Sequence, residues 1–278
     1  MTTFFMRFPG GLAKALTFSY DDGVESDIRF MNILDKYNMK CTFNINSGCY
    51  APEGKVYPEG TVHRRMSKSE CLKAYVNNNH EVAIHGYSHP FWNQIPPAMA
   101  TLDIVEDRKN LEDLFSGIIR GAAYPFGAYD DTVVEILENA GIAYCRTTKA
   151  THSFSIPTDW LRLHPTCHHC DKELNSLADK FLEMNPTRAS QLFYVWGHTY
   201  EFDRDNNWQV IEDFCEKLGH ADDIWYCTNI ELYDYIRAFN SLDISADMKI
   251  VHNPTSVKIW VDWNGSIHMI DAGETVKL

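Results

Sequence analysis

The sequence predicts an α/β fold in which helices surround a parallel sheet, and three observations support this prediction. Short runs rich in β-forming residues alternate with segments of helical periodicity, which is the pattern of a parallel sheet covered by helices. The chain has 278 residues, of which 45% are hydrophobic, and a single (β/α) barrel needs about 250 residues. The polar residues that could perform chemistry follow the ends of the predicted strands, where barrel active sites lie.

The predicted elements succeed one another without a repeat or a flexible linker. Ser67 with Glu70 and Thr228 with Glu231 form capping boxes, each of which predicts the start of a helix. The first of these helices is expected to stop at the run Asn77, Asn78 and Asn79. The predicted strands cover residues 13–20, 40–46, 81–84, 118–124, 142–147, 191–196 and 224–227, and the other helices cover residues 26–37, 101–115, 130–139, 174–184 and 208–218.

The end of the chain differs from this alternating pattern. Beyond about residue 245 only short β segments are expected, with a turn at Asn264 and Gly265. We therefore predict a barrel over residues 1–245 and a C-terminal β extension, packed on the barrel, over residues 246–278.

Composition limits the partners and the compartment. A formal net charge of −13 argues against binding to nucleic acid, whose phosphates an acidic surface repels. No run approaches the roughly 20 apolar residues that span a membrane, and residues 1–7 lack the features of a signal peptide. The eight cysteines then indicate reduced thiols and a cytoplasmic location. The oligomeric state cannot be inferred.

Two motifs at predicted strand ends suggest a metal site. Asp21 and Asp22 end the first strand, although an Asp-Gly pair is also a common turn signal. His85 and His89 follow the short strand 81–84, and two histidines four residues apart can bind one ion if the segment turns, or can simply face solvent. Taken alone, the first motif favours a turn, and the second favours two histidines that face solvent. One Asp and two His together, however, form an open, catalytic type of metal site.

Two further motifs also follow strands. Tyr124, Phe126 and Gly127 lie in a loop whose backbone N–H groups could face an oxyanion, and Trp196 and His198 end a later strand. In isolation they would be interpreted as a plain loop and a strand cap. Because they share one rim of the barrel with the Asp and His residues, we interpret them as parts of the same site.

These motifs, in this order, resemble the polysaccharide deacetylase family, carbohydrate esterase family four. The resemblance spans about residues 13–200. It implies a distorted (β/α) barrel of seven or eight strands in which Asp21 is the general base and His198 the general acid. It further implies that Asp22, His85 and His89 bind a divalent metal.

Two positions depart from the family pattern. The third motif of the family has an Arg that tethers the base, whereas this chain has Ala123, so Arg120, Arg146 and Arg162 are the candidate replacements. Asp159, followed by Trp160, weakly resembles the fourth motif, whose acid orients the terminal histidine.

A cluster of histidine and cysteine residues has no counterpart in these motifs. It consists of His164, Cys167, His168, His169 and Cys170. Because a second Cys-x-x-Cys is missing, we expect a loop near the active site, with neither Cys167 nor Cys170 binding zinc.

The predicted activity is metal-dependent hydrolysis that removes an acetyl group from an N- or O-acetylated carbohydrate. Zinc is the expected ion, although cobalt, nickel or manganese would suit the same donors. Two alternatives remain at this point: a hydrolase of a small amide or cyclic ureide, similar to allantoinase, and a catalytically inactive sugar-binding protein. Tyr124, Phe126, Gly127 and Trp196 are the predicted substrate and oxyanion contacts.

Overall fold

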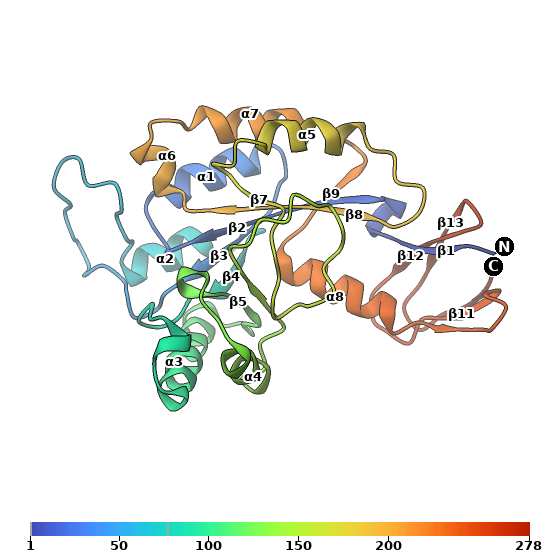
Figure 1. The fold of residues 1–278 in the computed structure, drawn as a ribbon, viewed down its shortest axis with the longest axis horizontal. Helices are drawn as coiled ribbons and strands as arrows, with labels where there is room; N and C mark the ends of the chain where they lie inside the picture. The colour runs from blue at the N-terminus through green and yellow to red at the C-terminus, as the bar shows by residue number, and fades with distance from the viewer. Residues whose placement is uncertain (1, 77) are drawn as a thin grey trace.

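In a computed structural model, which describes residues 2–76 and 78–278, a curved sheet of eight parallel strands forms the centre of the molecule (Figure 1). The strand order is β6-β5-β4-β3-β2-β8-β7, and β9 pairs with the first half of β2. The strands are β2 (Lys14–Asp21), β3 (Cys41–Ile45), β4 (Glu81–Ile84), β5 (Gly121–Ala123), β6 (Tyr144–Arg146), β7 (Cys167–His168), β8 (Gln191–Gly197) and β9 (Ile224–Tyr226).

Helices cover both sides of this sheet. In Figure 1, α1, α5 and α7 lie on one side and α2, α3, α4 and α8 on the other. Every residue of β2 is buried, as expected for a central strand of a parallel sheet. The helices are α1 (Ser26–Asp35), α2 (Lys68–Tyr75), α3 (Pro97–Phe115), α4 (Asp131–Asn139), α5 (Leu174–Glu183), α6 (Tyr200–Arg204), α7 (Gln209–Leu218) and α8 (Asn229–Asn240), with short 3-10 turns η1 (Pro9–Gly11), η2 (Trp92–Gln94) and η3 (Pro125–Gly127).

The segment between β6 and β7 links the two edges of the sheet. The Leu163 N–H donates to the Cys145 carbonyl at 3.0 Å, and the Thr147 N–H donates to the Leu163 carbonyl at 2.9 Å. Shortly afterwards β7 pairs with β8. The predicted distorted (β/α) barrel is confirmed, and the distortion lies at this irregular connection.

Two small antiparallel sheets lie beside the barrel. One joins β1 (Phe4–Arg7) to β12 (Ile259–Trp263) and β13 (Ser266–Ile270). The other joins β10 (Asp243–Ile244), β11 (Ile250–His252) and β14 (Thr275–Lys277). The N-terminal strand therefore shares a sheet with the C-terminal extension, which the sequence did not reveal. The proposed division at residue 245 stays a prediction.

The sequence located most elements to within a few residues. Both predicted capping boxes form, at the starts of α2 and α8. The first of these helices is predicted to stop at residues 77–79, of which Asn77 falls outside the described residues, and α2 ends just before this run, at Tyr75. Within the described part of the chain, no helix has the length and apolar character needed to cross a membrane.

Candidate active site and metal centre

Asp22, His85 and His89 converge at the C-terminal ends of β2 and β4. One ligand atom from each lies within 4.8 Å of the others. The two Nε2 atoms of the histidines are 3.2 Å apart. Two segments separated by about 60 residues in sequence thus meet because their strands end at the same rim of the barrel.

The donor atoms of this group fit a divalent cation. His85 Nδ1 lies 2.9 Å from the Ala123 carbonyl oxygen, which can only accept, so Nδ1 carries the proton and the Nε2 lone pair faces His89. Zinc binds each histidine nitrogen at about 2.0–2.1 Å, which places two such nitrogens about 3 Å apart. Burial lowers the pKa of His85, and it lowers the pKa of His89 to about 4, so both rings are neutral at neutral pH, which is the form of histidine that can bind a metal.

Two residues from the long loop after β3 also contact Asp22, and the sequence did not single them out. Arg65 lies 2.9 Å from Asp22 Oδ1, and His63 Nε2 lies 3.1 Å from Oδ2. Burial opposes ionisation of Asp22, but the His63 contact and the Arg65 charge outweigh burial and lower its pKa. The carboxylate is therefore ionised, as a metal ligand must be.

Arg146 takes the place of the Arg that is missing at Ala123. Its side chain donates to Asp21 Oδ2 from the end of β6, and both side chains are buried. Burial alone raises the pKa of Asp21, but the charges of Arg146, His85 and His198 outweigh it, and the pKa is lowered. Asp21 is held as a carboxylate, in the state that a general base requires.

The other two candidate arginines are engaged elsewhere. Arg120 forms a bidentate pair with Asp234, and Arg162 pairs with Asp131 and Asp159. The replacement for the missing Arg therefore comes from the neighbouring strand β6.

His198 lies at the end of β8 with carboxylates at both ring nitrogens. Its Nε2 is 3.7 Å from Asp21 Oδ2, and its Nδ1 is 3.4 Å from Glu201 Oε2. Burial tends to lower the pKa of His198, but Glu201, Asp21 and Asp22 outweigh this effect and raise it. The protonated form that a general acid needs is thereby favoured.

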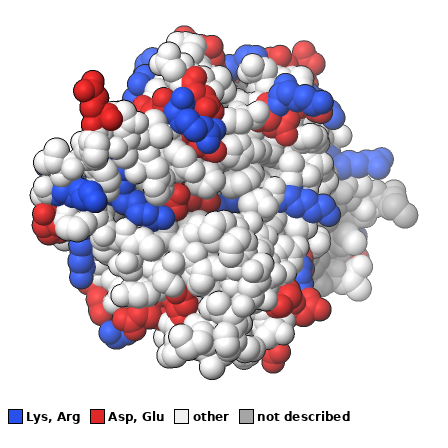
Figure 2. Space-filling model, turned by 60° about the vertical axis from the view of Figure 1, so that its left-hand side comes forward, with Lys and Arg blue, Asp and Glu red and all other residues white. Residues whose placement is uncertain are grey.

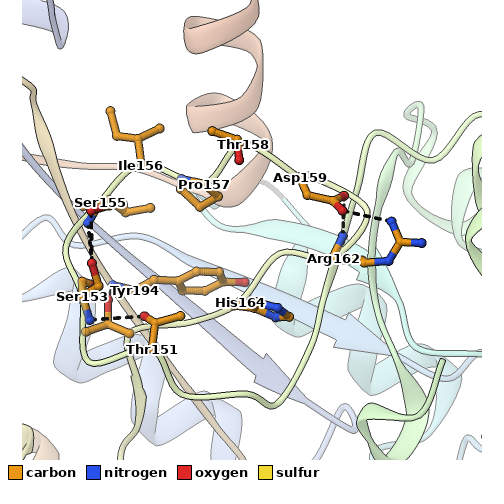
Figure 3. Close-up of a pocket in the computed structure, with 12 residues that line it drawn as sticks. Thr151, Ser153, Ser155, Ile156, Pro157, Thr158, Asp159, Arg162, His164 and Tyr194 are labelled. Atoms are coloured by element: carbon orange, nitrogen blue, oxygen red, sulfur yellow. Dashed lines mark hydrogen bonds and ion pairs between the residues drawn. The ribbon is translucent and has the colours of Figure 1, made fainter. Parts of the chain in front are cut away.

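The acid beside His198 is Glu201, so the proposed role of Asp159 is wrong. Asp159 lines a pocket of about 290 Å³ that is formed mostly by the segment between β6 and β7, and it bonds there to Arg162 (Figure 3). His164 and Tyr194 line the same pocket, whereas Asp21, Asp22 and His198 do not. Glu201 lies only three residues after His198, a spacing that could have revealed it.

The four predicted substrate and oxyanion contacts differ in their availability. Phe126 is 55% exposed and stacks on Phe91 with ring centroids 3.9 Å apart, beside His89. Trp196 is buried over the Arg146 guanidinium. Tyr124 does not fit the prediction, because its ring is buried and its hydroxyl donates to the Leu161 carbonyl.

The prediction for Gly127 also needs correction. Its N–H donates to the Tyr124 carbonyl at 2.9 Å and is not free for an oxyanion. Gly127 instead allows the chain to turn, because its φ is +69° and a Cβ there would lie 2.3 Å from Thr148 Oγ1.

Backbone strain is concentrated around these side chains. Asp22, His89 and Phe126 have φ values of 90°, 56° and 58°. This region is unfavourable for residues with a Cβ, and such strain often accompanies functional sites.

The histidine and cysteine cluster lies next to this site, as expected. His168 contacts Trp196, with ring centroids 4.6 Å apart. Cys167 is fully buried, and Cys170 is exposed. All eight cysteines are free thiols.

Comparison with known proteins agrees with this geometry. The family model of polysaccharide deacetylases matches residues 10–145, the segment that carries Asp21, Asp22, His85 and His89. Over these residues, just under half of the chain, the protein is similar to the polysaccharide deacetylase family. This family comprises hydrolases that act on carbon–nitrogen bonds, so the predicted enzyme class is confirmed at the level of the family. No curated protein matches the chain significantly.

Solved structures of this family have the same fold. A putative polysaccharide deacetylase from Mycobacterium smegmatis superposes with a TM-score of 0.57 and 16% identity over 84% of this chain and 93% of that one. A family 4 carbohydrate esterase from Streptomyces lividans, solved with acetate, superposes with a TM-score of 0.52 and 15% identity over 78% of this chain and 92% of that one. A family 4 pseudoenzyme from Bacillus anthracis superposes with a TM-score of 0.50 and 16% identity over 83% of this chain and 68% of that one.

Proposed function

We propose that this protein is a metal-dependent deacetylase that hydrolyses the acetyl group of an N- or O-acetylated carbohydrate. The observation that carries the proposal is the meeting of a complete metal-ligand set with a buried base and a histidine acid at one rim. Asp21 Oδ2 lies between the two sides, 3.6 Å from His85 Nε2 and 3.7 Å from His198 Nε2.

Asp22, His85 and His89 are the residues that would hold the ion. A divalent cation bound there would act as a Lewis acid toward the acetyl carbonyl and would lower the pKa of water. Zinc suits these donors, as do cobalt, nickel and manganese. His63 and Arg65 keep the Asp22 carboxylate ionised and oriented.

Asp21 removes a proton from the attacking water. Arg146 fixes one of its oxygens, and the Asn44 amide donates to the other at 2.8 Å, so the carboxylate cannot rotate away. We assign the Phe126 N–H as the donor to the developing oxyanion, because the Gly127 N–H is already occupied.

His198 protonates the leaving nitrogen or oxygen. Glu201 at Nδ1 orients the ring so that Nε2 points toward the side of the site where Asp21 lies. An amine leaves poorly without a proton, so this step matters most for N-acetyl groups.

The surface around the site suits a neutral sugar. Phe91 and Phe126 form an exposed, stacked aromatic pair next to His89, and such faces can pack against a sugar ring. On the face seen in Figure 2, charges of both signs surround a broad uncharged area. That distribution offers no extended basic track for a polyanion.

Acetate release provides the test. The purified protein, loaded with zinc or cobalt, should release acetate from N-acetylglucosamine oligomers or acetylated xylan. The His85→Ala/His89→Ala variant should release none. Ring opening of allantoin without acetate release would support a ureide hydrolase instead, and binding of the oligomers without hydrolysis would support an inactive sugar-binding protein.

A further inference from the structure

A second group of side chains that could hold a metal ion lies where β7 and α6 meet the rim. His168 is the last residue of β7, His169 and Cys170 follow it, and Glu201 extends from α6. One ligand atom from each of these four residues lies within 4.8 Å of the others. None of them belongs to the Asp22, His85 and His89 set.

One member of this group, His169, is buried without hydrogen-bond partners for its ring. His169 is 1% exposed, and neither of its ring nitrogens forms a hydrogen bond within the described part of the chain. Glu201 Oε2 is also buried, and it lies 3.4 Å from His169 Nε2. Buried polar atoms normally have partners, so the unpartnered ring nitrogens of His169 point to a missing ligand.

The position of His169 is tightly determined. Its ring stacks on Tyr20 at 5.6 Å and on Phe202 at 4.2 Å between ring centroids, and its backbone N–H donates to the Trp196 carbonyl. A Cβ at Gly197 would come within 1.9 Å of His169 Nδ1, so only glycine leaves room for this ring. The imidazole is thus held in place before any ligand arrives, which favours binding.

His168 has a different role from its neighbour. The Cys170 backbone N–H donates to His168 Nδ1 at 3.1 Å, so the neutral ring carries its proton on Nε2. That nitrogen lies 3.2 Å from Glu201 Oε2. A protonated nitrogen cannot bind a metal, and His168 therefore positions Glu201.

We propose that His169, Cys170 and Glu201 bind a second divalent transition-metal ion of the zinc class. For Cys170 this proposal departs from the expectation drawn from the sequence, which did not foresee that Glu201 lies beside it. An imidazole, a thiolate and a carboxylate are all zinc ligands, and the thiolate selects against magnesium and calcium. The anionic thiolate and carboxylate balance the ion's charge. Arg204, 3.5 Å from Glu201 Oε1, holds the other carboxylate oxygen and leaves Oε2 to the ion. The ion has a route from solvent, because Cys170 is exposed.

Binding at this second site should affect His198. Glu201 Oε2 is also the oxygen 3.4 Å from His198 Nδ1, so an ion that takes this oxygen weakens the carboxylate's hold on the histidine. Excess zinc should then inhibit acetyl hydrolysis. This consequence rests on the proposed function, whereas the existence of the second site does not.

Cobalt titration of the metal-free, full-length protein separates the two sites. Only the second site contains sulfur, so only cobalt bound there gives a thiolate-to-metal charge-transfer band in the near ultraviolet. We expect two equivalents of cobalt and this band in the unmodified protein. The His85→Ala/His89→Ala variant should lose one equivalent and keep the band, even if it has no deacetylase activity.

Cys170→Ser is the decisive variant, because this exposed side chain can change without disturbing the core. It should lose the band and one equivalent of cobalt, while the matched control Cys49→Ser, at another accessible thiol, keeps both. Glu201→Gln should weaken cobalt binding at the second site at least tenfold, as judged by the band. Absence of the band at saturating cobalt, or its survival in Cys170→Ser, would overturn the proposal.

Discussion

The two sides of the barrel rim differ in how they are built. On the first side, Asp21, Asp22, His85 and His89 come from the segment that matches the family, and they lie at or just after the ends of β2 and β4. On the second side, His168, His169, Glu201 and His198 lie beyond that segment, and three imidazoles surround one carboxylate oxygen.

The difference shows how each side obtains its geometry. Asp22 and His89 adopt positive φ values of 90° and 56°, so the first side depends on a strained backbone. His169 instead is held by packing between aromatic rings and against Gly197. Substitution of the ligands themselves should therefore disturb the first side most. The second side should be disturbed most by substitution of the residues that surround Glu201.

Removal of the metal ligands on the first side should have the largest effect. His85→Ala/His89→Ala removes two of three donors, so we expect loss of that ion and of acetate release together. Metal analysis and acetate assays measure both quantities. The control His252→Ala, at β11 in the extension, should change neither. Full activity with stoichiometric metal at that site in the double variant would disprove the assignment.

The next largest effect should follow from removal of the base. Asp21→Asn keeps the shape but not the proton affinity, so the rate should fall roughly 10²–10⁴-fold. Metal content should be unchanged, because Asp21 is tied to Arg146 and is not a ligand. If Asp21→Asn lost as much metal as Asp22→Asn does, the two acids would not have separate roles.

On the second side, His198→Ala should affect substrates unequally. Its loss removes the proton that an amine leaving group needs, so hydrolysis of an N-acetylated sugar should fall by roughly 10²–10⁴-fold. An aryl acetate, whose phenolate leaves unaided, should lose far less. Initial rates on both substrates measure this contrast, and equal losses would point to a structural His198.

The smallest effect should come from Glu201→Gln, with a loss of about tenfold in kcat/KM. Glu201 raises the pKa of His198, so the amide lowers it, and the protonated acid disappears at a lower pH. The basic limb of the pH profile should therefore move toward lower pH. Asp159→Asn, at a carboxylate that bonds to Arg162, should leave the profile unchanged. An unmoved limb in Glu201→Gln would remove Glu201 from the acid's environment.

The sequence by itself determined the barrel and the first side of the site. Alternating strands and helices, and two capping boxes, are local signals that tertiary packing here did not override. Asp22, His85 and His89 could be predicted because Asp22 follows β2 and both histidines follow β4, and the ends of parallel strands meet at one rim.

Only the tertiary structure decided which side chains support these residues. Arg146 reaches Asp21 across 125 positions, and Arg65 reaches Asp22 across 43. Nothing in the sequence distinguishes Arg146 from Arg120, because a long side chain can serve any carboxylate within its reach. Glu201 replaces Asp159 for the same reason: the loop after β6 turns Asp159 toward Arg162, while α6 directs Glu201 toward His198. Local patterns specify elements, whereas the partners of buried charges depend on distances that exist only after folding.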